Sequence, residues 1–157
     1  MRITAFAIGL FAMIVGLVCA PTPAFAAGSG QPAAVLNQAI SAFNKGDMKA
    51  WTAICDSPAV AIDDFAPHLW QGPAACTDWS RDFTAMTKQQ GIKSGTVTLG
   101  PVWHSAVTGN RAYLVYPATF SFQQKGKMMN TGGIFTFVMN KTANGWRVAA
   151  WSWADRH

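Results

Sequence analysis

From residue 96 to the C-terminus, apolar and polar residues alternate, as they do in β-strands with one buried face. The alternation predicts four long strands, at residues 96–107, 111–124, 128–139 and 146–154. We expect a bulge in the first at Gly100 and Pro101, because proline has no amide to donate to a sheet. Asn144 and Gly145 between the last two strands are typical of a hairpin turn. The pattern therefore indicates an antiparallel meander.

The preceding part of the chain has helical spacing of its apolar residues. Pro32 opens a first helix that Gly46 ends, and Asp47 is placed to cap a second. A third helix is expected between Gly72 and Gly91. The second and third helices carry apolar stripes, made of Met48, Trp51, Ile54 and Cys55 and of Cys76, Trp79, Phe83 and Met86. Two short strands, at residues 59–65 and 68–71, lie between these helices.

Helices followed by a long sheet predict an α+β domain in which the helices cover one face of the sheet. A strongly twisted sheet wrapped around helices forms a cone that is open at one end. Small ligands bind in such concavities. We assign this domain to residues 33–157 and a small polar, disordered leader to residues 27–32.

The first 26 residues are typical of a cleavable signal peptide. Arg2 precedes an uncharged run of about 16 residues, which is shorter than the roughly 20 needed to span a bilayer. Ala24, Phe25 and Ala26 then provide the small-residue cleavage pattern. We therefore expect a periplasmic or secreted protein without a stable membrane anchor.

The charge of the chain does not indicate a nucleic-acid partner. The formal net charge is +5, and removal of Arg2 with the signal peptide lowers it by one unit. The remaining cations are scattered rather than clustered or interleaved with aromatic residues, so we expect a solvated basic surface. The seven acidic residues are all aspartates.

Cys55 and Cys76 are the only cysteines after residue 26, and an even number in an oxidising compartment predicts a disulfide. Two buried thiols are the alternative. Neither cysteine belongs to a CxxC pair, and His68 and His104 lack the spacing of a metal site. We expect no metal and no cofactor.

The order of elements and several landmarks resemble the SnoaL-like branch of the nuclear transport factor 2-like superfamily. The resemblance covers about residues 33–155. Its landmarks are the sequences at residues 43–47, 62–65, 70–73 and 144–148, which read FNKGD, IDDF, WQGP and NGWRV. It implies a cone-shaped fold, often a homodimer formed through the sheet, with a pocket between sheet and helices. It implies no single activity, because isomerases, cyclases, dehydratases and binding modules share the fold.

The ketosteroid isomerase branch of this superfamily has an aspartate base near the end of the first strand, and Asp63 or Asp64 matches that position. The same branch uses a tyrosine and a second, protonated acid as hydrogen-bond donors. These two positions fall on Ala39 and near Gly133 in this chain. The resemblance therefore carries over the base but neither donor.

Asp63, Asp64, His68 and His104 are the candidate catalytic residues. Neighbours in a strand point to opposite faces, so we expect at most one of the two aspartates to enter the pocket. Burial would raise the pKa of that carboxyl and suit it to general-base catalysis. A turn that contains two solvated aspartates is the alternative.

Tryptophan is unusually frequent, with seven residues in the chain. An indole supplies a large apolar area and one hydrogen-bond donor, which suits either a core or a ligand-binding wall. We expect Trp51 and Trp79 to be core residues, and Trp151, Trp153 and Asp155 to share a face that is a wall of the pocket or of a dimer. The candidate ligand-binding residues are Trp70, Tyr116, Trp151 and Trp153.

Three functions remain open. The first is an exported module that binds a small, largely apolar molecule without catalysis. The second is an acid/base isomerase, dehydratase or cyclase that uses a pocket Asp and His. The third is an accessory domain whose sheet pairs with itself or with a partner chain.

Overall fold

The computed structural model describes residues 31–156, and the predicted signal peptide lies outside these residues. The helices are α1 (Pro32–Asn44), α2 (Met48–Thr52) and α3 (Ala75–Gln90). The strands are β1 (Cys55–Ile62), β2 (Leu69–Gly72), β3 (Ile92–Leu99), β4 (His104–Thr108), β5 (Arg111–Gln124), β6 (Lys127–Thr142) and β7 (Gly145–Asp155).

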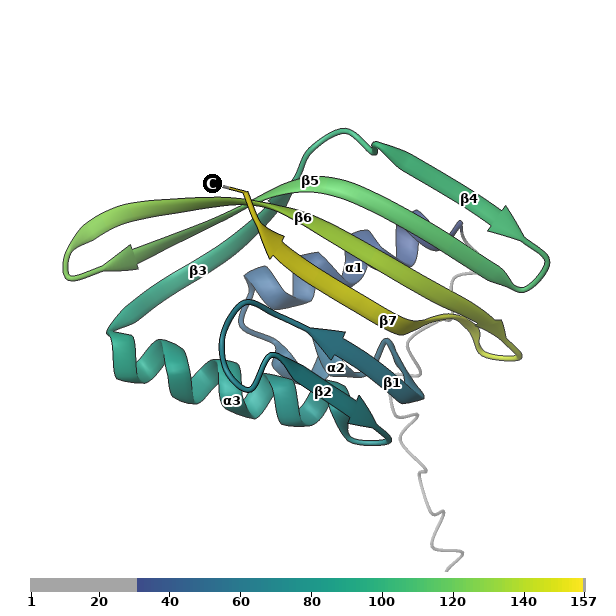
Figure 1. The fold of residues 1–157 in the computed structure, drawn as a ribbon, viewed down its shortest axis with the longest axis horizontal. Coiled ribbons are helices and arrows are strands. Elements are labelled where there is room, and N and C mark those ends of the chain that lie inside the picture. The colour runs from purple at the N-terminus through teal and green to yellow at the C-terminus, as the bar shows by residue number, and fades with distance from the viewer. Residues whose placement is uncertain (1–30, 157) are drawn as a thin grey trace, which may run out of the picture.

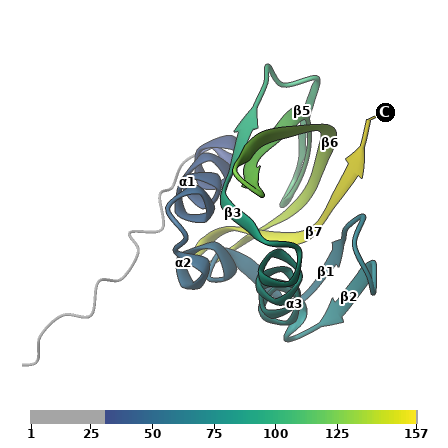
Figure 2. The same ribbon diagram turned by 90° about the vertical axis from the view of Figure 1, so that its left-hand side faces the viewer.

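The strands form one curved, seven-stranded sheet in the order β2-β1-β7-β6-β5-β3, and β4 also pairs with β5 (Figure 1). Adjacent strands are antiparallel except β1 and β7, which run parallel. Parallel strands need a long crossover connection, and here the crossover contains β2, α3 and the remaining strands. The three helices lie on one side of the sheet, which bends around them (Figure 2). This is the α+β cone that the sequence predicts.

The predicted strand at residues 96–107 is two strands in the structure. β3 pairs with the second half of β5 and β4 with the first half, so the two lie end to end along one partner. Pairing continues through Gly100, whose amide donates to the Pro117 carbonyl at 2.8 Å, and then stops at Pro101. The missing amide of Pro101 therefore ends the strand, a stronger effect than the bulge expected.

The first short strand is also shifted from its predicted position. β1 begins at Cys55, which helical spacing assigned to the second helix, and ends at Ile62, before the two aspartates. Pro32 is the first residue of α1, as the helix prediction has it, so the predicted leader at residues 27–32 extends one residue too far. The C-termini of the first and third helices are predicted at Gly46 and Gly91, and α1 and α3 end close to these residues. Gly91 has a left-handed backbone (φ 67°).

The core lies between the helices and the inner face of the sheet. Inward residues of β5 and β6 alternate with outward ones, so that Leu114, Phe137 and Met139 are at most 1 % exposed. Helix α1 contributes Leu36 and Ile40 from its apolar face. Within residues 31–156, no helix combines the length and the apolarity needed to cross a bilayer.

The predicted disulfide is confirmed. Cys55, at the start of β1, is bonded to Cys76, in the first turn of α3 (S–S 2.01 Å). The bond closes a loop of 21 residues that contains β2, and such a loop corresponds to about 3 kcal/mol of stabilisation by restriction of the unfolded chain.

Candidate functional site

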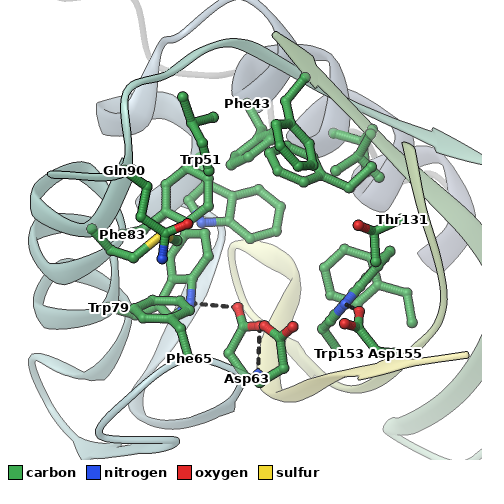
Figure 3. Close-up of a pocket in the computed structure, with 18 residues that line it drawn as sticks. Phe43, Trp51, Asp63, Phe65, Trp79, Phe83, Gln90, Thr131, Trp153 and Asp155 are labelled. Atoms are coloured by element: carbon green, nitrogen blue, oxygen red, sulfur yellow. Dashed lines mark hydrogen bonds between the residues drawn. The ribbon is translucent and has the colours of Figure 1, made fainter. Parts of the chain in front are cut away.

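A cavity of about 240 Å³ lies between α1, α3 and the inner face of the sheet. Nine of its eighteen lining residues are aromatic (Figure 3). The lining is Ile40, Phe43, Trp51, Asp63, Asp64, Phe65, Trp79, Phe83, Met86, Gln90, Ile92, Val97, Phe120, Phe122, Thr131, Phe135, Trp153 and Asp155. The cavity is therefore an apolar, aromatic chamber with a few polar groups.

Both the helical spacing of apolar residues and the two-residue alternation of the strands place side chains in this lining. On α3, Trp79, Phe83 and Met86 are spaced at helical intervals and face the sheet. On β5, Phe120 and Phe122 are two residues apart and therefore share the inner face. The same argument places Trp153 and Asp155 together on β7.

Two tryptophans of the lining are oriented by carboxylates. The indole nitrogen of Trp79 donates to Asp63 Oδ2 at 2.8 Å, and that of Trp153 donates to Asp155 Oδ1 at 2.7 Å (Figure 3). The Trp79 ring also stacks on Phe83, with ring centres 5.0 Å apart and planes 18° apart. Each indole is thus held by a polar contact at one edge and by packing on its face.

Asp63 is the most perturbed acid of the cavity. Its Oδ1 accepts the backbone amide of Asp64 at 2.8 Å, and its own amide donates to the His68 carbonyl at 3.2 Å. Burial, and next a hydrogen bond with the Asp64 side chain, raise the pKa of Asp63 from 3.8 to about 8, against the lowering effect of the Trp79 and Asp64 N–H donors. Near neutral pH this carboxyl is therefore mainly protonated in the unliganded protein.

Both Asp63 and Asp64 line the cavity, so the expectation that only one would enter it is wrong. The two-residue alternation of a strand does not apply to them, because β1 ends at Ile62. The chain turns at Asp63, and this turn brings both carboxyl groups to the same side. Asp63 is half-buried and Asp64 is exposed.

The two histidine candidates lie outside the lining of the cavity. His68 is exposed, and its Nδ1 is 3.2 Å from the backbone oxygen of Asp63, so it contacts the turn from outside. His104 is exposed on β4, with its ring centre 5.6 Å from that of Tyr113. The structure does not bring either imidazole to the carboxyl groups of the cavity.

Of the four candidate ligand-binding aromatics, Trp153 lines the cavity, whereas Trp70, Tyr116 and Trp151 are core residues. Trp70 donates its indole N–H to Asp82 at 2.9 Å. Burial raises the pKa of Tyr116. Trp151 is 2 % exposed and packs perpendicular to Trp79, with ring centres 4.9 Å apart.

The positions of the two missing isomerase donors are closed by packing. Ala39 is 1 % exposed within the core. A Cβ atom at Gly133 would lie 2.4 Å from the Trp153 ring, so no side chain fits there without displacing that ring. Asp155, the partner of Gly133 across β6 and β7, carries a carboxylate that lines the cavity instead.

Trp79 and Trp51 take part in the site although the sequence indicates only a core role for them. The contact between Trp79 and Asp63 joins α3 to the end of β1, and nothing in local sequence marks it. Trp51 lines the cavity, and its buried indole nitrogen has no hydrogen-bond partner among the described residues. Residues 31–156 contain no group of three His, Cys, Asp or Glu side chains arranged to hold a metal ion.

The raised pKa of Asp63 predicts a specific dependence of stability on pH. Between pH 3.8 and about 8, folded Asp63 holds a proton that the unfolded chain releases, so its contribution to stability falls as the pH rises through this window. We expect the melting temperature of the wild-type protein, relative to Asp63→Asn, to fall by roughly 10 to 15 °C from about pH 5 to about pH 9. The part of this range below a pKa of about 8 corresponds to about 4 kcal/mol, at about 3 to 4 °C per kcal/mol for a domain of this size.

Asp78→Asn, which removes an acid on α3 outside the cavity, is the matched control and should show a nearly constant difference from wild type. Scanning calorimetry measures all three proteins. Parallel curves for wild type and Asp63→Asn would contradict the assignment of a proton to folded Asp63.

Several solved structures share the fold at low sequence identity. A nuclear transport factor 2-like superfamily protein from Salmonella enterica matches with TM-score 0.65 and 18 % identity over 79 % of this chain and 87 % of that one. A ketosteroid isomerase-like protein from Erwinia carotovora matches with TM-score 0.63 and 15 % identity over 80 % and 93 %. The CaMKII hub of S. rosetta matches with TM-score 0.61 and 19 % identity over 79 % and 93 %.

No curated protein matches the chain by sequence. The family model for the SnoaL-like domain, however, matches residues 33–153, which is most of the chain. Its match includes every helix and strand except the first residue of α1 and the last two residues of β7. The chain therefore belongs to the SnoaL-like domain family, within the nuclear transport factor 2-like superfamily.

Proposed function

We propose that this protein is an exported small-molecule-binding domain whose cavity holds a small, largely apolar ligand. The observation that carries the proposal is the cavity of about 240 Å³ with nine aromatic side chains in its lining. Ligand sites are typically concave, mainly apolar and supplied with a few polar groups that fix orientation. The Asp63, Asp64 and Asp155 side chains provide such groups here.

The apolar walls alone support only weak binding. A ligand of one aromatic ring that buries about 150 Å² of apolar surface gains at most about 4 kcal/mol before the cost of association is subtracted, so burial alone gives a dissociation constant of about 1 mM or weaker. Tighter binding requires the polar groups of the cavity. Ligand identity is therefore determined mainly at the aspartates.

Filling the cavity should abolish binding. Thr131 lies on β6 opposite Phe120 and lines the cavity, so a phenylalanine there would occupy ligand space. We expect Thr131→Phe to weaken binding of a neutral probe such as indole at least about tenfold, as seen by saturation-transfer NMR. Thr98→Phe, the same change at an exposed position on β3, should bind the probe as wild type does. Equal binding by both variants would place the ligand elsewhere.

A second candidate function is proton-transfer catalysis by an isomerase, dehydratase or cyclase. Asp63 supports it, because a half-buried carboxyl with a raised pKa suits a general acid or base near neutral pH. Asp155 places another carboxylate in the same cavity. The catalytic set would then consist of carboxyl groups, without an imidazole.

Isotope exchange tests this candidate without knowledge of the substrate. A cyclic ketone probe such as 1-indanone has a weakly acidic C–H beside its carbonyl. An acid/base site should accelerate deuterium incorporation there in heavy water, and Asp63→Asn should lower the rate about 100-fold or more. Mass spectrometry of the probe gives the rate. Exchange no faster than in buffer alone, or unchanged by the substitution, would contradict catalysis by Asp63.

The outer face of the sheet supports a homodimer. Ile62 on β1, Leu69 on β2 and Tyr113 on β5 point away from the helices and are 46 %, 49 % and 43 % exposed. Ile62 and Leu69 are direct partners across the two strands, so they form a continuous apolar surface. This pair is a small apolar patch that a second subunit could cover.

Native mass spectrometry of the protein from its host tests export and dimerisation together. We expect subunits that begin at Ala27, lack two hydrogens because of the Cys55–Cys76 bond, and associate in pairs. Ile62→Lys should yield monomers, whereas Met128→Lys, at a more exposed apolar site on β6 near the β5–β6 turn, should leave the dimer intact. Subunits that retain residues 1–26 would contradict export by cleavage, and wild-type monomers would contradict the dimer.

A further inference from the structure

The acidic residues of this chain divide into two groups with different surroundings. Four aspartates stabilise the fold. Asp47 caps α2, Asp56 accepts a hydrogen bond from Asn140, and Asp78 and Asp82 pair with Arg81. The other three of the seven line the cavity: Asp63, Asp64 and Asp155.

The charges of the cavity are opposite to those of the whole chain. The chain has twelve Lys and Arg residues against seven aspartates. None of the Lys, Arg or His residues within 31–156 lines the cavity, although three aspartates do. If charges were distributed at random in a basic protein, we would expect more cations than aspartates in the lining. All the ionisable side chains that line the cavity are therefore acidic, although the molecule as a whole is positively charged.

The carboxyl groups at this site also have an unfavourable environment in the unliganded protein. Asp63 is half-buried beside aromatic rings, and its side chain lies against that of Asp64. Two neighbouring carboxylates repel each other, and burial of either as an anion costs free energy unless a cation compensates it. Protonation of Asp63 relieves part of this cost. A positively charged occupant would relieve more of it, because it would interact with both carboxyl groups.

The aromatic rings of the lining suit the same kind of occupant. The faces of indole and phenyl rings attract cations, and tryptophan does so most strongly. Trp51, Trp79 and Trp153 line the cavity together with six phenylalanines, and the last two tryptophans turn their N–H edges to Asp63 and Asp155. Rings and carboxylates arranged together are what recognition of an ammonium group requires.

We propose that the cavity takes an organic cation, an amine or quaternary ammonium group on an apolar body, with its positive charge at Asp63 and Asp64 and its body among the phenylalanines. This proposal rests on the proposed binding function and specifies the chemical class of the ligand.

Two probes of equal shape test the contribution of charge. Benzyltrimethylammonium and neopentylbenzene differ only in the atom at the branch point, a positively charged nitrogen or a neutral carbon. Quenching of tryptophan fluorescence in the mature, disulfide-bonded protein at about pH 7.5 gives both affinities. We expect the cation to bind at least about tenfold more tightly, which corresponds to about 1.4 kcal/mol.

Substitutions of aspartates inside and outside the cavity show where the charge of the probe is recognised. Asp63→Asn combined with Asp64→Asn should weaken binding of the cation at least about tenfold and leave binding of neopentylbenzene unchanged, which also shows that the variant is folded. Asp78→Asn removes a charge outside the cavity and should bind both probes as wild type does.

Equal or tighter binding of the neutral probe by wild type would overturn the cation proposal and leave the proposed binding function in place. Binding of neither probe would overturn both. A preference for the cation that persists in the double variant would also overturn the proposal, because the charge would then be recognised elsewhere. If the double variant does not fold, the comparison of the two probes on wild type decides the question.

Discussion

The indole of Trp79 connects the core of this protein to its cavity. It contacts five other aromatic rings, those of Phe43, Trp51, Phe65, Phe83 and Trp151. Its N–H donates to Asp63 and so holds the turn after β1 against α3. The apolar packing and the position of the acidic group therefore depend on one side chain. The disulfide reinforces this arrangement, because it joins the first turn of α3 to the start of β1.

The architecture could be predicted from the sequence because its signals are local. The Asn144–Gly145 turn and the alternation around Leu114 specify hairpins over a few residues. Gly46 and Gly91 end helices for reasons of backbone conformation alone. The boundary of β1 could not be predicted in the same way. Its parallel pairing with β7, about 90 residues later in the chain, determines where the strand begins and ends, and no neighbouring residue encodes that partner.

The site was predictable only in part for the same reason. The resemblance to a family indicated Asp63 and Asp64, and alternation placed Trp153 with Asp155. Which face each aspartate occupies depends on a turn whose geometry comes from contacts with α3, so the alternation rule failed there. His68 and His104 were chosen for their chemistry, but the fold leaves both in solvent outside the cavity. Residue type identifies candidates, and tertiary contacts decide among them.

The close approach of Gly133 to Trp153 has a consequence for the evolution of this pocket. Because a Cβ atom at residue 133 would lie 2.4 Å from the rigid indole, an acid cannot be introduced at that position by a single substitution. Trp153 would have to be replaced by a smaller residue first, and that intermediate would lose the hydrogen bond to Asp155 and a wall of the cavity. A side chain at residue 133 therefore requires a change at residue 153 as well, whereas Asp155 already presents a carboxyl group to the same cavity.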